Sequence, residues 1–291
     1  MTKPFEEKIA IIGHGFVGKA TEVGFSLNTQ ICVIDPKENT KVSDLEEFKP
    51  KFVFVCVPTP MEKSGAQDFS IVLDVFDQIS KLSFKPCVIL KSTVTPENLD
   101  SAKKILPNYV YNPEFLREKH AEEDFINSQM ILLGGKKPFQ EKVKKLYQDH
   151  SLCNAANFIF TDHATASLVK YSINSFLATK VLFFNQLKDI FEGSNAGGGW
   201  ESFINLIRLD QRIGISHMDV PGHDGKKGFG GACFTKDTAA LVEYSNSIDK
   251  EFSLLAKVIN INNEIRSQYK KLDKREKDQN VNYNFDKKSR L

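Results

Sequence analysis

The sequence predicts an α/β protein, with a doubly wound N-terminal domain followed by an all-helical domain. Short apolar runs rich in β-branched residues recur through the first half of the chain, and segments with helical periodicity lie between most of them. Runs that are apolar on both faces are typical of a parallel sheet covered on both sides. After about Thr161 the strand patterns stop. We therefore expect domains at 1–161 and 162–272, and a polar, disordered tail at 273–291.

The expected elements follow in chain order. Six runs are typical of strands, KIAIIG, ICVID, FVFVCV, CVILK, MILLGG and FIFT, which begin at residues 8, 31, 52, 87, 130 and 158. Periodicity predicts helices over 70–81 and 138–149, and one long helix from Asp162 to about Phe191. The glycine-rich EGSNAGGGW follows, and further helical segments extend to about Leu272.

Composition excludes several classes. The 291 residues are 41% hydrophobic and 26% charged with a net charge of +2, which gives no electrostatic case for nucleic acid or an anionic membrane as partner. No stretch approaches the ~20 apolar residues of a membrane span, and the N-terminal apolar run is too short for a signal peptide. Five cysteines without framework spacing fit the cytoplasm, and neither a CxxC pair nor a histidine cluster predicts a metal. Four of them lie in or beside apolar runs, where we expect burial: Cys32, Cys56, Cys87 and Cys153.

The first strand ends in a GxGxxG pattern that opens a helix. This spacing predicts a tight turn, a close backbone approach to a pyrophosphate, and close packing of helix on strand. The second strand ends in Asp35, about 20 residues on, where a carboxylate takes the ribose hydroxyls of a dinucleotide. The pattern therefore predicts a bound cofactor, and the carboxylate favours NAD over NADP. The loop residues expected at NAD are Gly13, Gly15, Phe16, Val17 and Gly18.

Polar residues follow the next two strands, at the edge of the sheet where ligands bind. Pro58-Thr59-Pro60 ends one strand and either lines the cofactor site or forms a rigid turn. After the next strand, Thr95 and Pro96 form a good helix start, which leaves Thr93 for chemistry. The residues expected at the cofactor here are Val57, Pro58, Thr59 and Thr93.

Two pairs of polar residues have helical spacing. Glu114 and Glu118 would share one face of a helix, whereas the acids at 122–124 are expected on a solvated face. Lys170 and Asn174 lie above one another on the long helix, either reaching solvent at its edge or held inside a cleft. Periodicity leaves both possibilities open.

Cys233 lies in KKGFGGACFTKD, directly after a glycine loop. We expect a helix to start here with Thr235 as its N-cap and Asp237 in its first turn. A helix N-terminus favours a thiolate, and glycines admit a phosphate close to the backbone. The pattern predicts a nucleophile, and the alternative is an incidental cysteine in a glycine-rich loop.

The blocks GHGFVGKA, CVPTPMEKSGAQDFS, KSTVTP, NPEFLRE, KYSINSFLATKVLFFNQ and PGHDGKKGFGGACFTKD occur in an order that resembles the UDP-glucose/GDP-mannose dehydrogenase family. The resemblance covers about residues 9–263. It implies a four-electron oxidation of a nucleotide-sugar C6 alcohol to the acid with two NAD. UDP-glucose is the expected substrate and GDP-mannose the alternative. It also implies a homodimer through the central helices.

The resemblance implies a role for each matched residue. Cys233 would capture the C6 aldehyde as a thiohemiacetal that is oxidised to a thioester. Glu114 would act as the base for thioester hydrolysis, with the water bridged by Thr93. Glu118 would contact the cofactor, and Arg212 the substrate of the partner subunit. Three further residues would handle the alcohol proton, water and oxyanion: Lys170, Asp237 and Asn174. The substrate-binding residues would be Glu114, Phe115, Leu116, Lys170, Asn174, Arg212, Phe229, Gly230 and Gly231.

The sequence also departs from the family pattern. Lys119, Ser167 and Gln186 replace the usual glycine and glutamates, and the chain is expected to be a short form that lacks the UDP-binding third domain. Two rival hypotheses follow. One is a β-hydroxyacid or 6-phosphogluconate type of dehydrogenase, which needs no cysteine. The other is a non-catalytic NAD-binding remnant that a partner chain completes.

Overall fold

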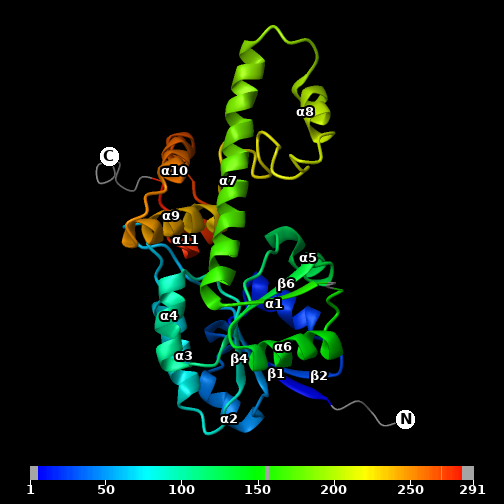
Figure 1. The fold of residues 1–291 in the computed structure, drawn as a ribbon, viewed down its shortest axis with the longest axis vertical. Coiled ribbons are helices and arrows are strands. Elements are labelled where there is room, and N and C mark those ends of the chain that lie inside the picture. The colour runs from blue at the N-terminus through cyan, green and yellow to red at the C-terminus, as the bar shows by residue number, and fades with distance from the viewer. Residues whose placement is uncertain (1–5, 155–156, 270, 284–291) are drawn as a thin grey trace. The chain divides into compact units, whose positions relative to one another are not determined.

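The computed structural model describes residues 6–154, 157–269 and 271–283, and the chain forms two compact units (Figure 1). Unit 1 comprises the chain up to Thr59 together with 68–170, and unit 2 comprises 60–67 and the chain from Tyr171 onward. The observed division therefore falls inside the long helix, after Lys170, whereas the expected boundary was at 161.

Unit 1 is an α/β domain around one seven-stranded sheet with the order β2-β1-β3-β4-β5-β6-β7. The strands are β1 Glu7–Ile12, β2 Thr29–Ile34, β3 Phe52–Val55, β4 Cys87–Leu90, β5 Val110–Tyr111, β6 Met130–Gly134 and β7 Asn157–Thr161. The predicted strand runs are all present. The expectation of a fully parallel sheet was wrong at one place, since β5 and β6 pair antiparallel. A run that is apolar on both faces has the same pattern in either direction, so the sequence carried no signal for this reversal.

Helices cover both faces of this sheet. One buried cluster joins the sheet to α1, α5 and α6, and a second joins its other face to α2, α3 and α4. The helices are α1 Phe16–Gly24, α2 Leu45–Phe48, α3 Ser70–Ser80, α4 Pro96–Ile105, α5 Ala121–Ile126 and α6 Lys137–His150, with 3₁₀ turns η1 Pro36–Glu38, η2 Val42–Asp44 and η3 Glu118–His120. This arrangement is the doubly wound fold that the sequence predicted.

Unit 2 is helical, as expected. The 31-residue helix α7, His163–Gly193, begins in unit 1 and continues into unit 2. It is followed by α8 Trp200–Arg208, α9 Ala232–Ser247, α10 Ser253–Arg266 and α11 Lys274–Asp278. Figure 1 shows α9 and α10 beside α7, and one buried cluster contains Ala178 of α7, Phe229 of the loop before α9 and Val258 of α10. Among the described residues, none of the helices combines the length and apolarity that crossing a membrane requires.

The expected disordered tail is structured over its first part. Asp273 and Glu276 form a reciprocal capping box at the start of α11. The N–H of Met61 donates to the carbonyl of Gln279 at 3.0 Å, and Val281 is 4% exposed. The high charge of this segment predicted disorder, because composition does not show which few of its residues are buried. Residues 284–291 of the expected tail lie outside the described residues.

His163, at the start of α7, gives unit 1 a pH-dependent stability. His163 is 6% exposed, its ring centre lies 4.4 Å from that of Tyr109 with the two rings tilted, and its Nε2 lies 3.2 Å from the Tyr109 carbonyl oxygen. Burial, aided by Lys103, lowers the pKa of His163 from 6.5 to about 4. The unfolded chain therefore binds a proton more tightly than the folded one, and the stabilisation present above pH 6.5 is lost as the pH falls towards 4.

We expect His163→Gln to remove this dependence. Between pH 7.5 and pH 5 the native chain should lose about 2 kcal/mol of unfolding free energy that the variant does not lose. Urea titrations of both proteins at the two pH values measure the difference. Equal losses in the two proteins would contradict the assignment.

Candidate functional site

Two of the three glycines in the first loop have the predicted tight turn and close packing, and the third lies beside open space. Gly13 has φ +92°, and a Cβ there would lie 2.8 Å from the carbonyl oxygen of Cys56. A Cβ on Gly18 would lie 2.1 Å from the Gly13 oxygen, so these two positions need glycine for close packing. Gly15, the N-cap of α1, has no atom within 4 Å of such a Cβ. The backbone before α1 is therefore open at the point where a pyrophosphate would approach.

Asp35 lies beside this loop, at the end of β2. Its carboxylate accepts hydrogen bonds from the backbone N–H of His14 at 2.7 Å and of Lys37 at 2.9 Å. Burial opposes ionisation, but these two bonds outweigh it and lower the pKa of Asp35. The side chain is half-buried and charged at neutral pH, which suits the acceptor of two ribose hydroxyls. Phe16 and Val17 form the first turn of α1 and are also half-buried.

The ends of β3 and β4 meet at the same edge of the sheet. The hydroxyl of Thr59 donates to the carbonyl of Thr93 at 3.1 Å, and Ser92 donates to the carbonyl of Val57 at 2.6 Å. Thr93 is 8% exposed, and Pro58 is exposed. These bonds hold the two expected cofactor segments together, so Thr59 does more than terminate a strand.

A buried ion pair lies in unit 1. Lys170 is 3% exposed and Glu114 is 8% exposed, and Lys170 Nζ lies 3.6 Å from Glu114 Oε1. The ammonium also lies 5.2 Å from the ring centre of Phe115, and the N–H of Leu116 donates to Glu114 Oε2 at 2.5 Å. Of the two possibilities left open for Lys170, the structure shows the buried one.

Glu114 and Glu118 do not share a helix face, contrary to the expectation. Glu114 lies between β5 and η3, outside any helix, whereas Glu118 is exposed at the start of η3. Pro113 disfavours a helical backbone at the preceding Asn112, whose buried side chain donates to the carbonyl of Leu132, so no helix runs into Glu114 from this side. The i, i+4 spacing therefore carried no structural meaning here.

Sequence reasoning missed Lys91, the last residue before Ser92. It is 3% exposed, and its Nζ donates to Asn112 Oδ1 at 3.1 Å and to Tyr147 OH at 3.3 Å. Burial lowers the pKa of Lys91. The signal available was a lysine that directly continues an apolar strand run, which is unusual unless its ammonium has buried partners.

In unit 2, Cys233 lies inside the first turn of α9, which begins at Ala232 with Gly231 as N-cap. The expected N-cap, Thr235, was wrong: its hydroxyl donates to the Gly231 carbonyl at 3.1 Å, one turn back. Gly231 has φ +76°, which glycine adopts without strain, so the helix starts earlier than a threonine cap allows. Cys233 is half-buried, and like the other four cysteines, all within the described residues, it forms no disulfide.

Asp237 follows one turn after Cys233 and is 1% exposed. Its Oδ2 accepts from Asn174 Nδ2 at 2.6 Å, and its Oδ1 lies 2.6 Å from Lys236 Nζ. Residues four apart lie above one another on a helix, so the thiol and this carboxylate share a face of α9. The structure therefore brings three of the predicted residues together in unit 2.

The remaining predicted residues lie around this helix start or apart from it. Phe229 and Gly231 donate their backbone N–H groups to Asn262 Oδ1 at 2.8 Å and Glu276 Oε1 at 3.1 Å. A Cβ on Gly230 would lie 1.6 Å from Arg266 Nη2, so a side chain there would displace the Arg266 guanidinium. Arg212 is 90% exposed and pairs with Asp210. Among the described residues, no group of three histidines, cysteines or carboxylates could hold a metal ion.

Family models match both units. Residues 47–151 match the NAD binding domain of the UDP-glucose/GDP-mannose dehydrogenase family, and residues 164–264 match its central domain. A UDP-glucose 6-dehydrogenase of Rickettsia felis is 35% identical over 231 residues, which is 77% of this chain and 50% of the relative. One of Rhizobium meliloti is 30% identical and covers 88% of this chain and 67% of the relative.

Solved structures show the same fold. A UDP-glucose dehydrogenase from Pyrobaculum islandicum superposes with a TM-score of 0.72 at 24% identity, covering 91% of this chain and 69% of that one. The GDP-mannose dehydrogenase of Pseudomonas aeruginosa gives a TM-score of 0.61 at 21% identity, covering 89% and 69% of the two chains. The chain spans about half the length of the Rickettsia relatives that it matches.

Proposed function

Because the chain belongs to the UDP-glucose/GDP-mannose dehydrogenase family, we propose that it oxidises the C6 alcohol of a nucleotide sugar to the carboxylate with NAD. UDP-glucose is the proposed substrate, since relatives that are about 35% identical carry the name UDP-glucose 6-dehydrogenase. GDP-mannose is the second candidate, because the family name covers both sugars.

The observation that carries the proposal is Cys233 in the first turn of α9, one turn before the buried Asp237. A thiol in the first turn of a 16-residue helix lies where the helix dipole stabilises a thiolate. A dehydrogenase that performs a single hydride transfer has no use for such a nucleophile. The arrangement therefore favours an oxidation that passes through a covalent thioester.

The proposed chemistry assigns a step to each residue. Cys233 adds to the C6 aldehyde to give a thiohemiacetal, and loss of a hydride from that carbon leaves a thioester. Glu114 removes a proton from the water that hydrolyses the thioester, which frees the thiol and the acid. Lys170, whose Nζ lies 3.6 Å from Glu114, stabilises oxyanions, with Thr93 orienting the water. Asp237 and Asn174 hold the alcohol and its proton.

The first loop fits NAD. Gly15 leaves the backbone open before α1, and the charged Asp35 provides acceptors for ribose hydroxyls while disfavouring a 2′-phosphate. When bound, NAD accepts the two electrons of each oxidation step as hydride. Val57, Pro58, Thr59 and Glu118 are the further residues that we propose at the cofactor.

We also propose a homodimer in the cytoplasm. Apolar side chains on α7 at heptad spacing, Phe176, Phe183 and Ile190, are 59–67% exposed, which suits a helix partner better than water. Leu254 on α10 is 65% exposed. Reduced thiols at all five cysteines suit the cytoplasm. Light scattering of the purified chain measures the subunit number.

The test is NADH release from purified protein with NAD and, separately, UDP-glucose, UDP-galactose, GDP-mannose and UDP-N-acetylmannosamine. Two NADH per sugar with one donor is the expected result and identifies the substrate. Tight NAD binding without turnover of any donor would contradict the proposal. That outcome would support the non-catalytic alternative.

A further inference from the structure

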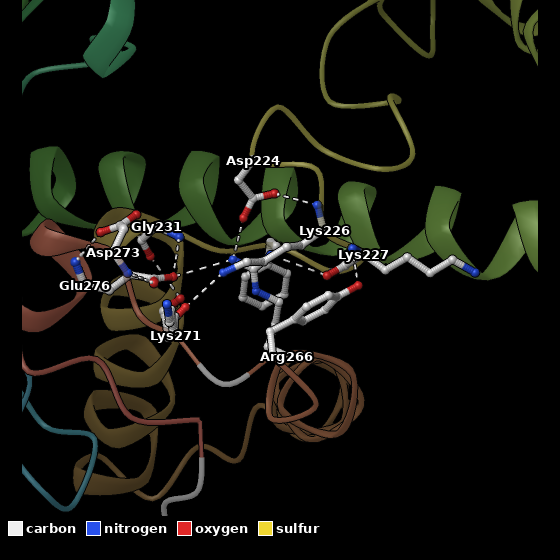
Figure 2. A network of polar contacts seen from close by, with 12 residues as sticks. Asp224, Lys226, Lys227, Gly231, Arg266, Lys271, Asp273 and Glu276 are labelled. Atoms are coloured by element: carbon white, nitrogen blue, oxygen red, sulfur yellow. Dashed lines mark hydrogen bonds and ion pairs between the residues drawn. The ribbon is translucent and has the colours of Figure 1, made fainter.

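The segment after α10 folds back onto the glycine loop that precedes Cys233. Figure 2 shows Arg266 between Asp224 and Glu276, with Gly231 and Asp273 beside the Glu276 carboxylate. Arg266 Nη2 lies 2.7 Å from Asp224 and 3.5 Å from Glu276, and its side chain is 2% exposed. The end of α10 and the segment after it therefore contact the loop through charged groups, of which Arg266 and Glu276 are buried.

Glu276 is the centre of this network and is 1% exposed. Its Oε1 accepts from the N–H of Gly231 at 3.1 Å and from Tyr283 OH at 2.7 Å, while its Oε2 accepts from the N–H of Asp273 at 2.9 Å. Burial opposes ionisation, but these bonds outweigh it and lower the pKa of Glu276. A buried carboxylate with this many donors is costly to disturb, because any lost donor stays out of water.

The bonds of Glu276 and Tyr283 end on the two sides of Cys233. Glu276 binds the N–H of Gly231, two residues before the thiol, and Tyr283 OH lies 3.4 Å from Thr235 Oγ1, two residues after it. Thr235 in turn donates to the Gly231 carbonyl at 3.1 Å. Burial raises the pKa of Tyr283 to about 12, so the phenol remains a donor at neutral pH. The one proton of each hydroxyl is used in these bonds, by Tyr283 on Glu276 and by Thr235 on Gly231, so the approach of Tyr283 to Thr235 is a packing contact. Glu276 and Thr235 thus bind the N–H and the carbonyl of Gly231, the residue from which α9 begins.

We propose that Glu276, together with Tyr283, is a positioning residue for the Cys233 thiol. It holds Gly231 at its positive φ, so that α9 starts at Ala232 and places Cys233 in the first turn. The proposal rests on the function proposed above for Cys233. The positioning role goes beyond that function because it gives the N–H of Gly231 a partner within this chain, where the sequence suggested a substrate contact.

The first experiment is hydrogen exchange measured by mass spectrometry on the full chain. Glu276→Gln is expected to speed exchange over 231–235 by about tenfold or more, with little change in α6. Tyr283→Phe is the milder variant, because it removes the hydrogen bond to Glu276 and keeps the ring. It is expected to speed exchange over 231–235 about threefold. Asp278→Asn, on the exposed face of α11, is the matched control and should change nothing. Unchanged exchange over 231–235 in both variants would overturn the proposal.

The second measurement separates positioning from general stability. Alkylation of Cys233 by iodoacetamide, followed on its peptide, should rise at least about threefold in Tyr283→Phe, because a loop that opens more often exposes the thiol more often. With an active native protein, kcat should fall while KM for NAD stays constant. A raised KM at constant kcat, or an unchanged alkylation rate, would refute the positioning role. If the native chain oxidises no sugar, only the proposed function fails, because exchange and alkylation need no substrate.

Discussion

Cys233→Ser is expected to abolish formation of the sugar acid while NAD still binds. Serine keeps the size of the side chain, but its hydroxyl does not ionise near neutral pH even at a helix N-terminus. We expect the rate of acid formation to fall by on the order of 10⁴-fold or more, because a covalent step has lost its nucleophile. The acid is measured by chromatography of the nucleotide products, and NAD affinity by calorimetry.

Cys87→Ser is the matched control for this variant. Cys87 begins β4, so it lies at the amino end of a strand, whereas ligands bind beyond the carboxyl ends. Burial raises the pKa of Cys87 to about 11, so its thiol is inert at neutral pH. Acid formation at the native rate in Cys233→Ser would refute the thioester mechanism. Loss of NAD binding in that variant would show a wider structural role for the residue.

Helices with regularly repeating apolar residues, and the loop with regularly spaced glycines, could be predicted from the sequence. The helices α3 and α6 and the long α7 begin and end within two residues of their expected bounds, because their apolar positions repeat regularly. The first loop was predictable too, since two glycines of GxGxxG answer steric demands within the chain. Gly13 and Gly18 meet neighbouring backbone, and Gly15 meets nothing.

The features that depend on contacts between distant residues could not be predicted. The start of α9 is set by Gly231, whose N–H is held by Glu276 from 45 residues further along the chain. Thr235, which precedes Lys236 and Asp237, matched the pattern of an N-cap. The sequence pattern does not show the contact between Gly231 and Glu276 that places the helix start earlier. The pairing of Lys170 with Glu114 is of the same kind, since 56 residues separate them and helical periodicity allows exposure as readily as burial. The local sequence pattern predicts each helix or strand. Whether a charged side chain is buried depends on which distant residues the complete fold brings beside it.

Glu114→Gln is expected to trap the covalent intermediate. If Glu114 is the base that activates water, its removal leaves both oxidation steps intact and slows only hydrolysis. We expect a burst of two NADH per active site followed by turnover about 10²- to 10³-fold slower than in the native chain. Intact-mass spectrometry should then show the nucleotide sugar attached to the protein, and peptide analysis should place it on Cys233.

Glu122→Gln is the matched control, since Glu122 lies exposed in the first turn of α5 and makes the same change of charge. It should turn over at the native rate and carry no adduct. The double variant Glu114→Gln with Cys233→Ser should also carry none, because the attachment point is gone. A slow Glu114→Gln without burst or adduct would mean that the carboxylate acts before the thioester forms. Its 3.6 Å pairing with Lys170 would then serve to position that ammonium for the first oxidation, and another residue would be the base for hydrolysis.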